Sequence, residues 1–310
     1  MSGAHHPRHA SRPSRVLTIA LPVGLAVTAL GVLWAIADAP AAAEAELPPP
    51  PMPVVAAQLP PVDLGGVVAS DPCADAAVVD ALAVGDDEAA ITAFGGGAAF
   101  REAVVAGNAP CISLSDPARL WLVVNKARPI EPLDFEPASL SEVDLAATTS
   151  SDRLRTDARD ALSALAHGAD ASGAGAIGIN NGYRSYDLQV STYSGFVASE
   201  GVAGADRGSA RAGFSEHQTG LAVDVVACDD GCGDIDAFGS TAQAAWVQEH
   251  AWEHGYVVRY ENGASDRTGY MPEPWHLRYV GPQLASAYHE GGFHTLEEFF
   301  GLPAAPDYAH

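Results

Sequence analysis

From about residue 119 onward, short apolar runs recur along the chain, and turn residues separate them. Five of these runs predict strands, at residues 120–126, 176–185, 214–227, 256–263 and 273–281. A helix ending near His167-Gly168 and an amphipathic helix over 240–255, stopped by Gly255, are expected between them. Helices and strands mix without regular βαβ alternation. The pattern therefore predicts an α+β fold, with a largely antiparallel sheet flanked by helices.

One predicted strand carries a carboxylate inside an apolar run. Alternate side chains of a strand point to opposite faces, so Asp224 in LAVDVV (221–226) points away from the apolar face. That apolar face is formed by Leu221, Val223 and Val225. Gly220 permits a tight turn, which can bring His217 back over the face of Asp224. We therefore expect an imidazole and a carboxylate to converge there.

The segment EPWHLRYVG (273–281) shows the same alternation. His276 and Arg278 share one face of the predicted strand. The other, packing face is formed by Trp275, Leu277 and Tyr279. Glu273 precedes His276 by three residues, which is close enough to reach the same site.

Two histidines and one aspartate form a three-ligand set that suits a catalytic zinc ion. The predicted ligands of one Zn²⁺ per chain are His217, Asp224 and His276, which leaves a fourth position for water. Zinc would lower the pKa of that water to about 7. A nearby carboxylate must then accept a proton and pass it to the leaving amine, and Glu273 fits this task. The metal would also compensate a carboxylate in an apolar strand.

The first part of the chain predicts targeting and spacing. Residues 1–15 are basic, whereas 16–37 carry no charge and match the roughly 20 residues of a membrane span. We expect a single-pass membrane anchor with an extracytoplasmic catalytic domain, or a secreted protein if this segment is a cleaved signal. The Ala- and Pro-rich segment 38–64 predicts an extended linker. Two short helices are expected in an accessory region, 65–118, before a catalytic domain at 119–310.

Charge and cysteine content narrow the function classes. The net charge of −23 argues against a nucleic-acid partner. Export would place the four cysteines where disulfides persist. Three pairings are possible, and we favour Cys73 with Cys111 and Cys228 with Cys232. A zinc knuckle at the C-x3-C spacing of the second pair is the alternative.

The motifs resemble those of a known enzyme family. S-x-H-x-x-G-x-A-x-D (215–224), followed by E-P-W-H (273–276), resembles the VanY-type D-alanyl-D-alanine carboxypeptidases, which are zinc peptidases of the hedgehog/DD-peptidase fold. Further similar segments are VVNKARPIEPLDFEPASL (123–140), GYRSYDLQ (182–189), VVRYENG (257–263) and TGYMPEPWHLRYVG (268–281). The resemblance covers roughly residues 119–285, in the order of the family's motifs.

This resemblance implies roles for particular residues. His217, Asp224 and His276 would bind zinc, and Glu273 would be the general base. Arg184, Gln189 and Ser215 would contact the peptide, with the Arg184 guanidinium pairing with its carboxylate or with the developing oxyanion. The implied function is removal of the C-terminal D-Ala from peptidoglycan stem peptides. We also expect the enzyme to be a monomer.

Three alternatives stay open at this stage. The enzyme could be an L,D-carboxypeptidase acting on tetrapeptides, or the domain a non-catalytic cell-wall binding module. The intact Glu273 argues against the module, because binding alone needs no base. A second metal site is conceivable at His250-Ala251-Trp252-Glu253-His254, which matches H-x-x-E-H. Those histidines stand at a helix end, where they also favour the helix dipole.

Overall fold

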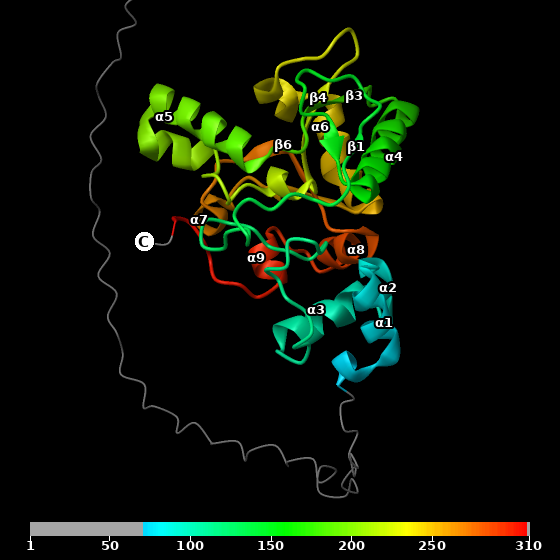
Figure 1. The fold of residues 1–310 in the computed structure, drawn as a ribbon. Helices are drawn as coiled ribbons and strands as arrows, with labels where there is room; N and C mark the ends of the chain where they lie inside the picture. Colours follow the sequence, from blue (N-terminus) through cyan, green and yellow to red (C-terminus); the bar gives the residue numbers. More distant parts are fainter. Residues whose placement is uncertain (1–70, 309–310) are drawn as a thin grey trace, which may run out of the picture. The chain divides into compact units, whose positions relative to one another are not determined.

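A computed structural model describes residues 71–308 of the chain (Figure 1). The predicted basic segment 1–15, membrane segment 16–37 and linker 38–64 lie outside the described residues. Among the helices of 71–308, none has both the length and the apolar character needed to cross a membrane.

The predicted α+β architecture is confirmed. Four strands form one sheet in the order β3-β4-β6-β5, and all neighbours are antiparallel. These strands are β3 (Ile177–Asn181), β4 (Ala222–Ala227), β5 (Tyr256–Tyr260) and β6 (Glu273–Tyr279). A separate antiparallel pair consists of β1 (Ser141–Glu142) and β2 (Arg153–Leu154).

Helices make up most of the remaining regular structure. The α-helices are α1 (Ala76–Val84), α2 (Asp87–Ala93), α3 (Gly97–Val105), α4 (Thr156–Ser172), α5 (Tyr186–Gly208), α6 (Ala242–His250), α7 (Ser265–Thr268), α8 (Pro282–Glu290) and α9 (Leu296–Phe299). The 3-10 helices are η2 (Pro72–Ala74), η3 (Glu216–Thr219), η4 (Ile235–Ser240) and η5 (Ala251–His254).

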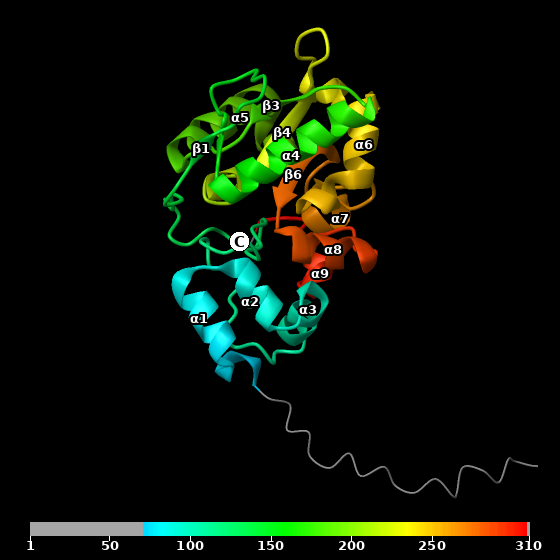
Figure 2. The same ribbon diagram turned by 90° about the vertical axis from the view of Figure 1, so that its right-hand side faces the viewer.

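One face of the four-stranded sheet packs against α4 and α6. Its hydrophobic cluster contains Leu162 and Leu165 of α4 and Val247 of α6. The strands contribute Val223, Val225, Leu277 and Tyr279 to the same cluster, and Leu221, just before β4, joins them. Figure 2 shows α4 and α6 beside β4 and β6, while Figure 1 shows the strands between α4 and α5. The alternation of these strands therefore leaves their other face free for polar side chains.

Local end signals of two helices behave as expected. The Ser185 hydroxyl caps α5 by accepting a hydrogen bond from the Leu188 amide. After α6, the chain tightens into η5 and stops at Gly255, which adopts a left-handed conformation with φ of 77°. Both signals are local, so they are legible in the sequence.

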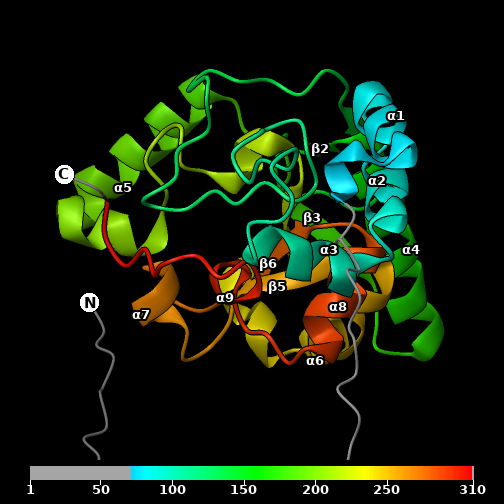
Figure 3. The same ribbon diagram turned by 90° about the horizontal axis from the view of Figure 1, so that it is seen from below.

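Residues 71–118, the part of the accessory region that the structure describes, hold three α-helices instead of the expected two. The helices α2 and α3 are distinct because the chain breaks at Gly95 and Gly96, both with φ of 97°. Phe100 of α3 packs in one hydrophobic cluster with Trp121 and with Leu284 of α8. Figure 3 shows α3 next to α8. The accessory helices thus share a core with the segment that follows residue 118.

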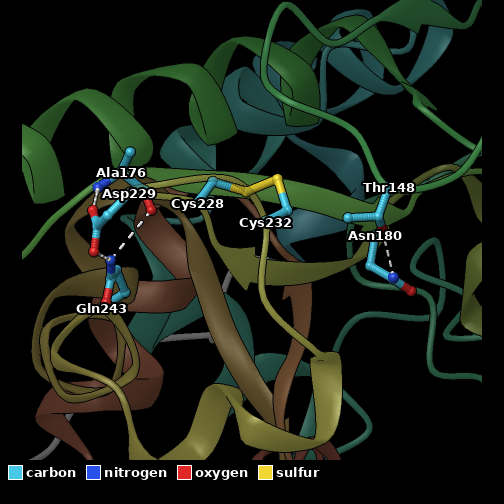
Figure 4. The surroundings of a disulfide bond; sticks show 7 residues. All are labelled: Thr148, Ala176, Asn180, Cys228, Asp229, Cys232 and Gln243. Carbon is cyan, nitrogen blue, oxygen red and sulfur yellow. Dashed lines mark hydrogen bonds between the residues drawn. A yellow bond between two sulfur atoms is a disulfide. The ribbon is translucent and has the colours of Figure 1, made fainter.

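Both favoured disulfides are present. Cys73 pairs with Cys111, and Cys228 pairs with Cys232. The second bond follows β4 directly (Figure 4), next to Asp229, whose carboxylate accepts hydrogen bonds of 2.8 Å from the Ala176 amide and from the Gln243 side chain. The zinc-knuckle alternative is therefore wrong, because these sulfurs are bonded to each other.

The predicted strand at 120–126 is wrong. Its apolar side chains are buried, but no neighbouring strand pairs with its backbone. Arginine side chains take that place: Arg278 donates to the carbonyl oxygens of Leu120 and Leu122 at 3.1 and 3.0 Å, and Arg259 donates to that of Val124 at 3.4 Å. A buried apolar run is therefore satisfied here by guanidinium groups.

The predicted end of the helix near His167-Gly168 is also wrong. The helix α4 continues through Gly168 to Ser172 and ends at Gly173, whose φ is 82°. A Cβ on Gly168 would lie 3.0 Å from the Trp246 ring, so the glycine permits α4 to pack closely against α6. Gly168 therefore serves packing within the helix, and Gly173 is the terminator.

Candidate active site

A tight turn carries His217 onto the polar face of the sheet. His217 lies in η3, and Gly220 follows with φ of 68° and donates its amide to the His217 carbonyl at 3.2 Å. A Cβ at Gly220 would be 2.9 Å from Leu140, so both space and conformation favour glycine. Asp224 follows in β4, and its side chain and that of His217 are buried.

The pairing of the strands places His276 and Asn181 next to Asp224. Asp224 pairs with His276 of β6 on one side and with Asn181 of β3 on the other. Oδ1 of Asp224 lies 3.1 Å from Nδ1 of His276, and Oδ2 lies 3.3 Å from Nε2 of His217. Asn181 donates its side-chain amide to Oδ2 at 3.2 Å. The predicted triad of His217, Asp224 and His276 is thus brought together.

His217 and His276 each make one hydrogen bond on the side of the ring away from Asp224. That bond determines which ring nitrogen carries the proton and which directs a lone pair toward Asp224. Nδ1 of His217 lies 2.8 Å from the Gly182 carbonyl, which can only accept, so this nitrogen carries the proton. Nε2 of His276 lies 3.2 Å from the Glu216 carboxylate and donates in the same way. In neutral rings, the lone pairs of the remaining nitrogens point at a carboxylate. A bound cation resolves that repulsion.

The pKa values of His276, His217 and Asp224 agree with a site that favours a positive charge next to an ionised carboxylate. Burial opposes a charge on His276, but hydrogen bonds to Asp224 and Glu216 outweigh it and raise its pKa to about 9. Burial lowers the pKa of His217, which keeps that ring neutral, the form that binds metals. Although burial also opposes ionisation of Asp224, its neighbouring histidines hold its pKa below its ordinary value.

The spacing of the donor atoms fits zinc. Bonds of about 2.0–2.2 Å at tetrahedral angles put neighbouring ligand atoms roughly 3.3–3.6 Å apart. Nε2 of His217 lies 3.3 Å from Oδ2 of Asp224, and Nδ1 of His276 lies 3.1 Å from its Oδ1. With one donor atom taken from each residue, the three atoms lie within 4.8 Å of one another. Within residues 71–308 this is the only group of three such side chains that close together. The residues therefore fit a tetrahedral ion with one further position.

Glu273 lies at the edge of this triad. Its Oε2 is 3.8 Å from Nδ1 of His276, as its position at the start of β6 led us to expect. Burial raises the pKa of Glu273 to about 8, while the charges of His276 and Arg184 oppose that change. A carboxyl group that titrates near neutral pH can both accept and return a proton.

Arg184 and Gln189 form a pair beside the triad. The Arg184 backbone amide donates to the His217 carbonyl at 3.2 Å, and its guanidinium donates to Gln189 Oε1 at 2.8 Å. Gln189 is fully buried, and its amide donates to the Ala210 carbonyl at 2.6 Å. Ser215 immediately precedes η3, but its hydroxyl does not cap that helix. The predicted substrate contacts of all three residues stay predictions.

A buried charged group behind His276 was not predicted from the sequence. Glu216 is 2% exposed and hydrogen-bonds Arg259 Nε at 2.9 Å as well as His276. Arg259 also pairs with Glu297 of α9 at 2.7 Å. One signal was available: Arg259 stands in the apolar strand VVRY and Arg278 in WHLRYV, and a buried arginine requires a carboxylate partner.

The second candidate metal site does not form. His250 Nδ1 pairs with Glu253 at 3.1 Å, and the His250 and His254 rings lie along Trp246, with centroid distances of 4.8 and 6.0 Å. The chain changes from α6 to η5 at this point, which breaks the regular spacing that H-x-x-E-H needs on one helix.

Comparisons with known proteins agree with this geometry. The family model VanY, D-alanyl-D-alanine carboxypeptidase, matches residues 151–282. YodJ of Bacillus subtilis (strain 168), a carboxypeptidase by name, is 36% identical over 192 residues, which are 61% of this chain and 69% of YodJ. A D-alanyl-D-alanine carboxypeptidase of Enterococcus faecium is 33% identical over 121 residues. That match covers 39% of this chain but only 35% of the Enterococcus protein.

A solved structure also resembles the chain. The LdcB LD-carboxypeptidase, whose structure is described as revealing the basis of peptidoglycan recognition, superposes with a TM-score of 0.55 and 36% identity. The match covers 60% of this chain and 87% of LdcB.

Proposed function

The chain belongs to the VanY family of D-alanyl-D-alanine carboxypeptidases, and from this we propose that it is a zinc-dependent D,D-carboxypeptidase. The proposed substrate is a peptidoglycan stem pentapeptide, from which the enzyme releases the C-terminal D-Ala. As a member of this family the protein is a peptidase, which excludes the non-catalytic binding module.

The observation that carries the proposal is the arrangement of three donor atoms around one point. Nε2 of His217, Nδ1 of His276 and the Asp224 carboxylate face one another, with each ring's other nitrogen already bonded. We propose that these residues hold Zn²⁺. When bound, zinc supplies Lewis-acid chemistry, which polarises a carbonyl group and makes water more acidic.

Glu273 is proposed as the general base. Its carboxylate would take a proton from the attacking water and return it to the amine of the departing D-Ala. Support comes from its position 3.8 Å from His276 and from the burial that raises its pKa to about 8. Replacing it with glutamine keeps the size of the side chain and removes this proton transfer.

Arg184 is proposed to bind the substrate's terminal carboxylate or the developing oxyanion. A guanidinium provides paired donors for either group. Gln189 accepts one Arg184 N–H, which fixes the direction of the remaining donors. We retain the predicted peptide contact of Ser215, which is adjacent to η3. Gln189 supports the proposal mainly through Arg184, since its own side chain is fully buried.

One observation favours a second candidate activity. LdcB, with 36% identity and a TM-score of 0.55, is an LD-carboxypeptidase. The same triad and base would serve the release of D-Ala from a tetrapeptide, in which the residue before the scissile bond has an L centre. The two activities therefore differ in substrate, and product analysis separates them.

We also propose that the enzyme acts outside the cytoplasmic membrane as a single-pass or secreted protein. The uncharged apolar segment 16–37 supports export. The two disulfides support an oxidising compartment.

Mass spectrometry of defined muropeptides tests the proposed function. The purified full chain is supplied with zinc and incubated separately with a pentapeptide ending in D-Ala-D-Ala and a tetrapeptide ending in D-Ala. Release of D-Ala from the pentapeptide, abolished by a chelator and restored by zinc, is expected. Preferred cleavage of the tetrapeptide would instead establish the LD activity.

Two variants make this test specific to the site. Glu273→Gln should lower kcat by about 10²- to 10⁴-fold, because a general base contributes that much. Glu142→Gln, at an exposed glutamate in β1, is the matched control and should behave like wild type. A zinc-loaded wild-type protein that cleaves neither peptide would refute the proposed function.

A further inference from the structure

We propose that Glu216 is a positioning residue that holds the His276 ring in the orientation and tautomer needed to bind the metal. This inference rests on the proposed zinc site. The Glu216 carboxylate bonds His276, Arg259 and Arg278, and Glu216 is not one of the three residues whose donor atoms converge. It acts through His276, whose Nε2 lies 3.2 Å from Glu216 Oε2.

The two nitrogens of the His276 ring face different carboxylates: Nε2 faces Glu216 and Nδ1 faces Asp224. An ionised carboxylate only accepts hydrogen bonds, so Nε2 must carry the proton when it faces Glu216. In the neutral ring, the form that binds a metal, Nδ1 then keeps its lone pair, directed toward Asp224 at 3.1 Å. A ring rotated by half a turn would present carbon atoms to both carboxylates. Glu216 therefore selects one of the two ring orientations.

A buried ion-pair network keeps Glu216 charged and fixed. Its Oε1 accepts from Arg259 Nε at 2.9 Å and lies 3.5 Å from Arg278 Nη1. The two guanidinium groups thus lie on the side of Oε1, while Oε2 faces Nε2 of His276. Oε1 of Glu216 is therefore held by the arginines, and Oε2 accepts the hydrogen bond from His276.

The network ends on a helix far along the chain. Arg259 donates to both carboxylate oxygens of Glu297 in α9, at 3.0 and 2.7 Å, and Asn125 donates to Glu297 at 2.9 Å. Two glutamates and two arginines balance in charge. The charges of the buried network therefore compensate one another, and the network needs no ion pair with Asp224.

Glu297 offers a matched control for Glu216. Both carboxylates are buried and both pair with Arg259, but only Glu216 reaches His276. In Glu216→Gln, the side-chain amide has one acceptor oxygen for two donors, Arg259 and His276. Its single oxygen cannot replace two carboxylate oxygens. Glu297→Gln weakens the same network without touching the ring.

The experiment measures zinc affinity on the full chain by competition with a chromogenic chelator, and the visible spectrum of the Co²⁺-substituted protein. Glu216→Gln should lower zinc affinity by about 10- to 100-fold and alter the Co²⁺ spectrum, whereas Glu297→Gln should stay within about threefold of wild type. Near-ultraviolet circular dichroism checks that each variant is folded. Glu216→Asp serves if Glu216→Gln does not fold, because it keeps the charge for Arg259 but withdraws from His276.

The outcomes separate the two proposals. Unchanged zinc affinity in Glu216→Gln, or an equal loss in Glu297→Gln, would overturn the positioning role and leave the proposed function intact. A wild-type protein that binds no zinc would overturn both. Reduced affinity confined to the Glu216 variants, with the Co²⁺ spectrum changed, is the result we expect.

Discussion

Replacing Gly97 with alanine should destabilise the protein, although this change normally strengthens a helix. Gly97 is the first residue of α3, where that helix meets α8. A Cβ built on Gly97 would lie 2.0 Å from the carbonyl oxygen of Gln283 and 2.7 Å from its carbonyl carbon. Real Cβ contacts essentially never fall below 3.0 Å, so α3 and α8 would have to separate by about 1 Å.

Two opposing effects decide the sign. Alanine gains at most about 1 kcal/mol over glycine in a helix. Overpacking a well-packed interface costs about 1–3 kcal/mol, and the upper part of this range applies because the contacted atoms are backbone and cannot rotate away. Separation also loosens the cluster around Phe100. We expect a net loss of about 1–2 kcal/mol, which lowers Tm by roughly 2–8 °C.

Gly195 provides the control. It lies in α5, is exposed, and a Cβ there would meet nothing within 4 Å. Gly195→Ala should therefore raise the free energy of unfolding by up to about 1 kcal/mol. Urea denaturation followed by circular dichroism measures both variants. A Gly97→Ala protein as stable as wild type would refute the inferred close contact between α3 and α8.

Three further predictions follow from buried or linked groups. Despite burial, the charge of Arg259 keeps the pKa of Glu297 below its ordinary 4.5, so its stabilisation is present above that pH and lost as the pH falls. Urea titrations at several pH values should show a shallower acid dependence for Glu297→Gln than for wild type. Removing the Cys73–Cys111 disulfide by double serine substitution should cost up to about 4 kcal/mol, because the bond closes a loop with a sequence separation of 38; an unchanged urea midpoint would contradict this. Gln189→Ala should lower kcat/KM and leave zinc affinity unchanged, because the Arg184 guanidinium loses the side chain that holds it in place. Steady-state assays measure kcat/KM, and chelator competition measures zinc affinity.

The strands and the metal triad were predictable because they follow local rules. A period of two separates Asp224 from the apolar side chains of β4, and the same period separates His276 from those of β6. Only the pairing of these strands was needed to bring the two residues together. Gly220, which turns the chain between His217 and β4, is also legible from its residue type.

Features that depend on distant side chains were not predictable in this way. Segment 120–126 has the composition of a strand, but its carbonyl oxygens are bound by arginines that lie far along the chain. Glu216 pairs with Arg259 and Arg278, which are 43 and 62 residues away. The close approach of α3 to α8 at Gly97 likewise joins segments that are far apart in the sequence.

The antiparallel register around Asp224 restricts how this chain can change in length. Because successive strand residues alternate between faces, inserting or deleting one residue between Gly220 and Asp224 would turn the carboxylate toward α4 and α6. The segment between Cys232 and α6 has no strand alternation to preserve. Natural variation in length should therefore accumulate beyond Cys232, while the four-residue step from Gly220 to Asp224 stays constant.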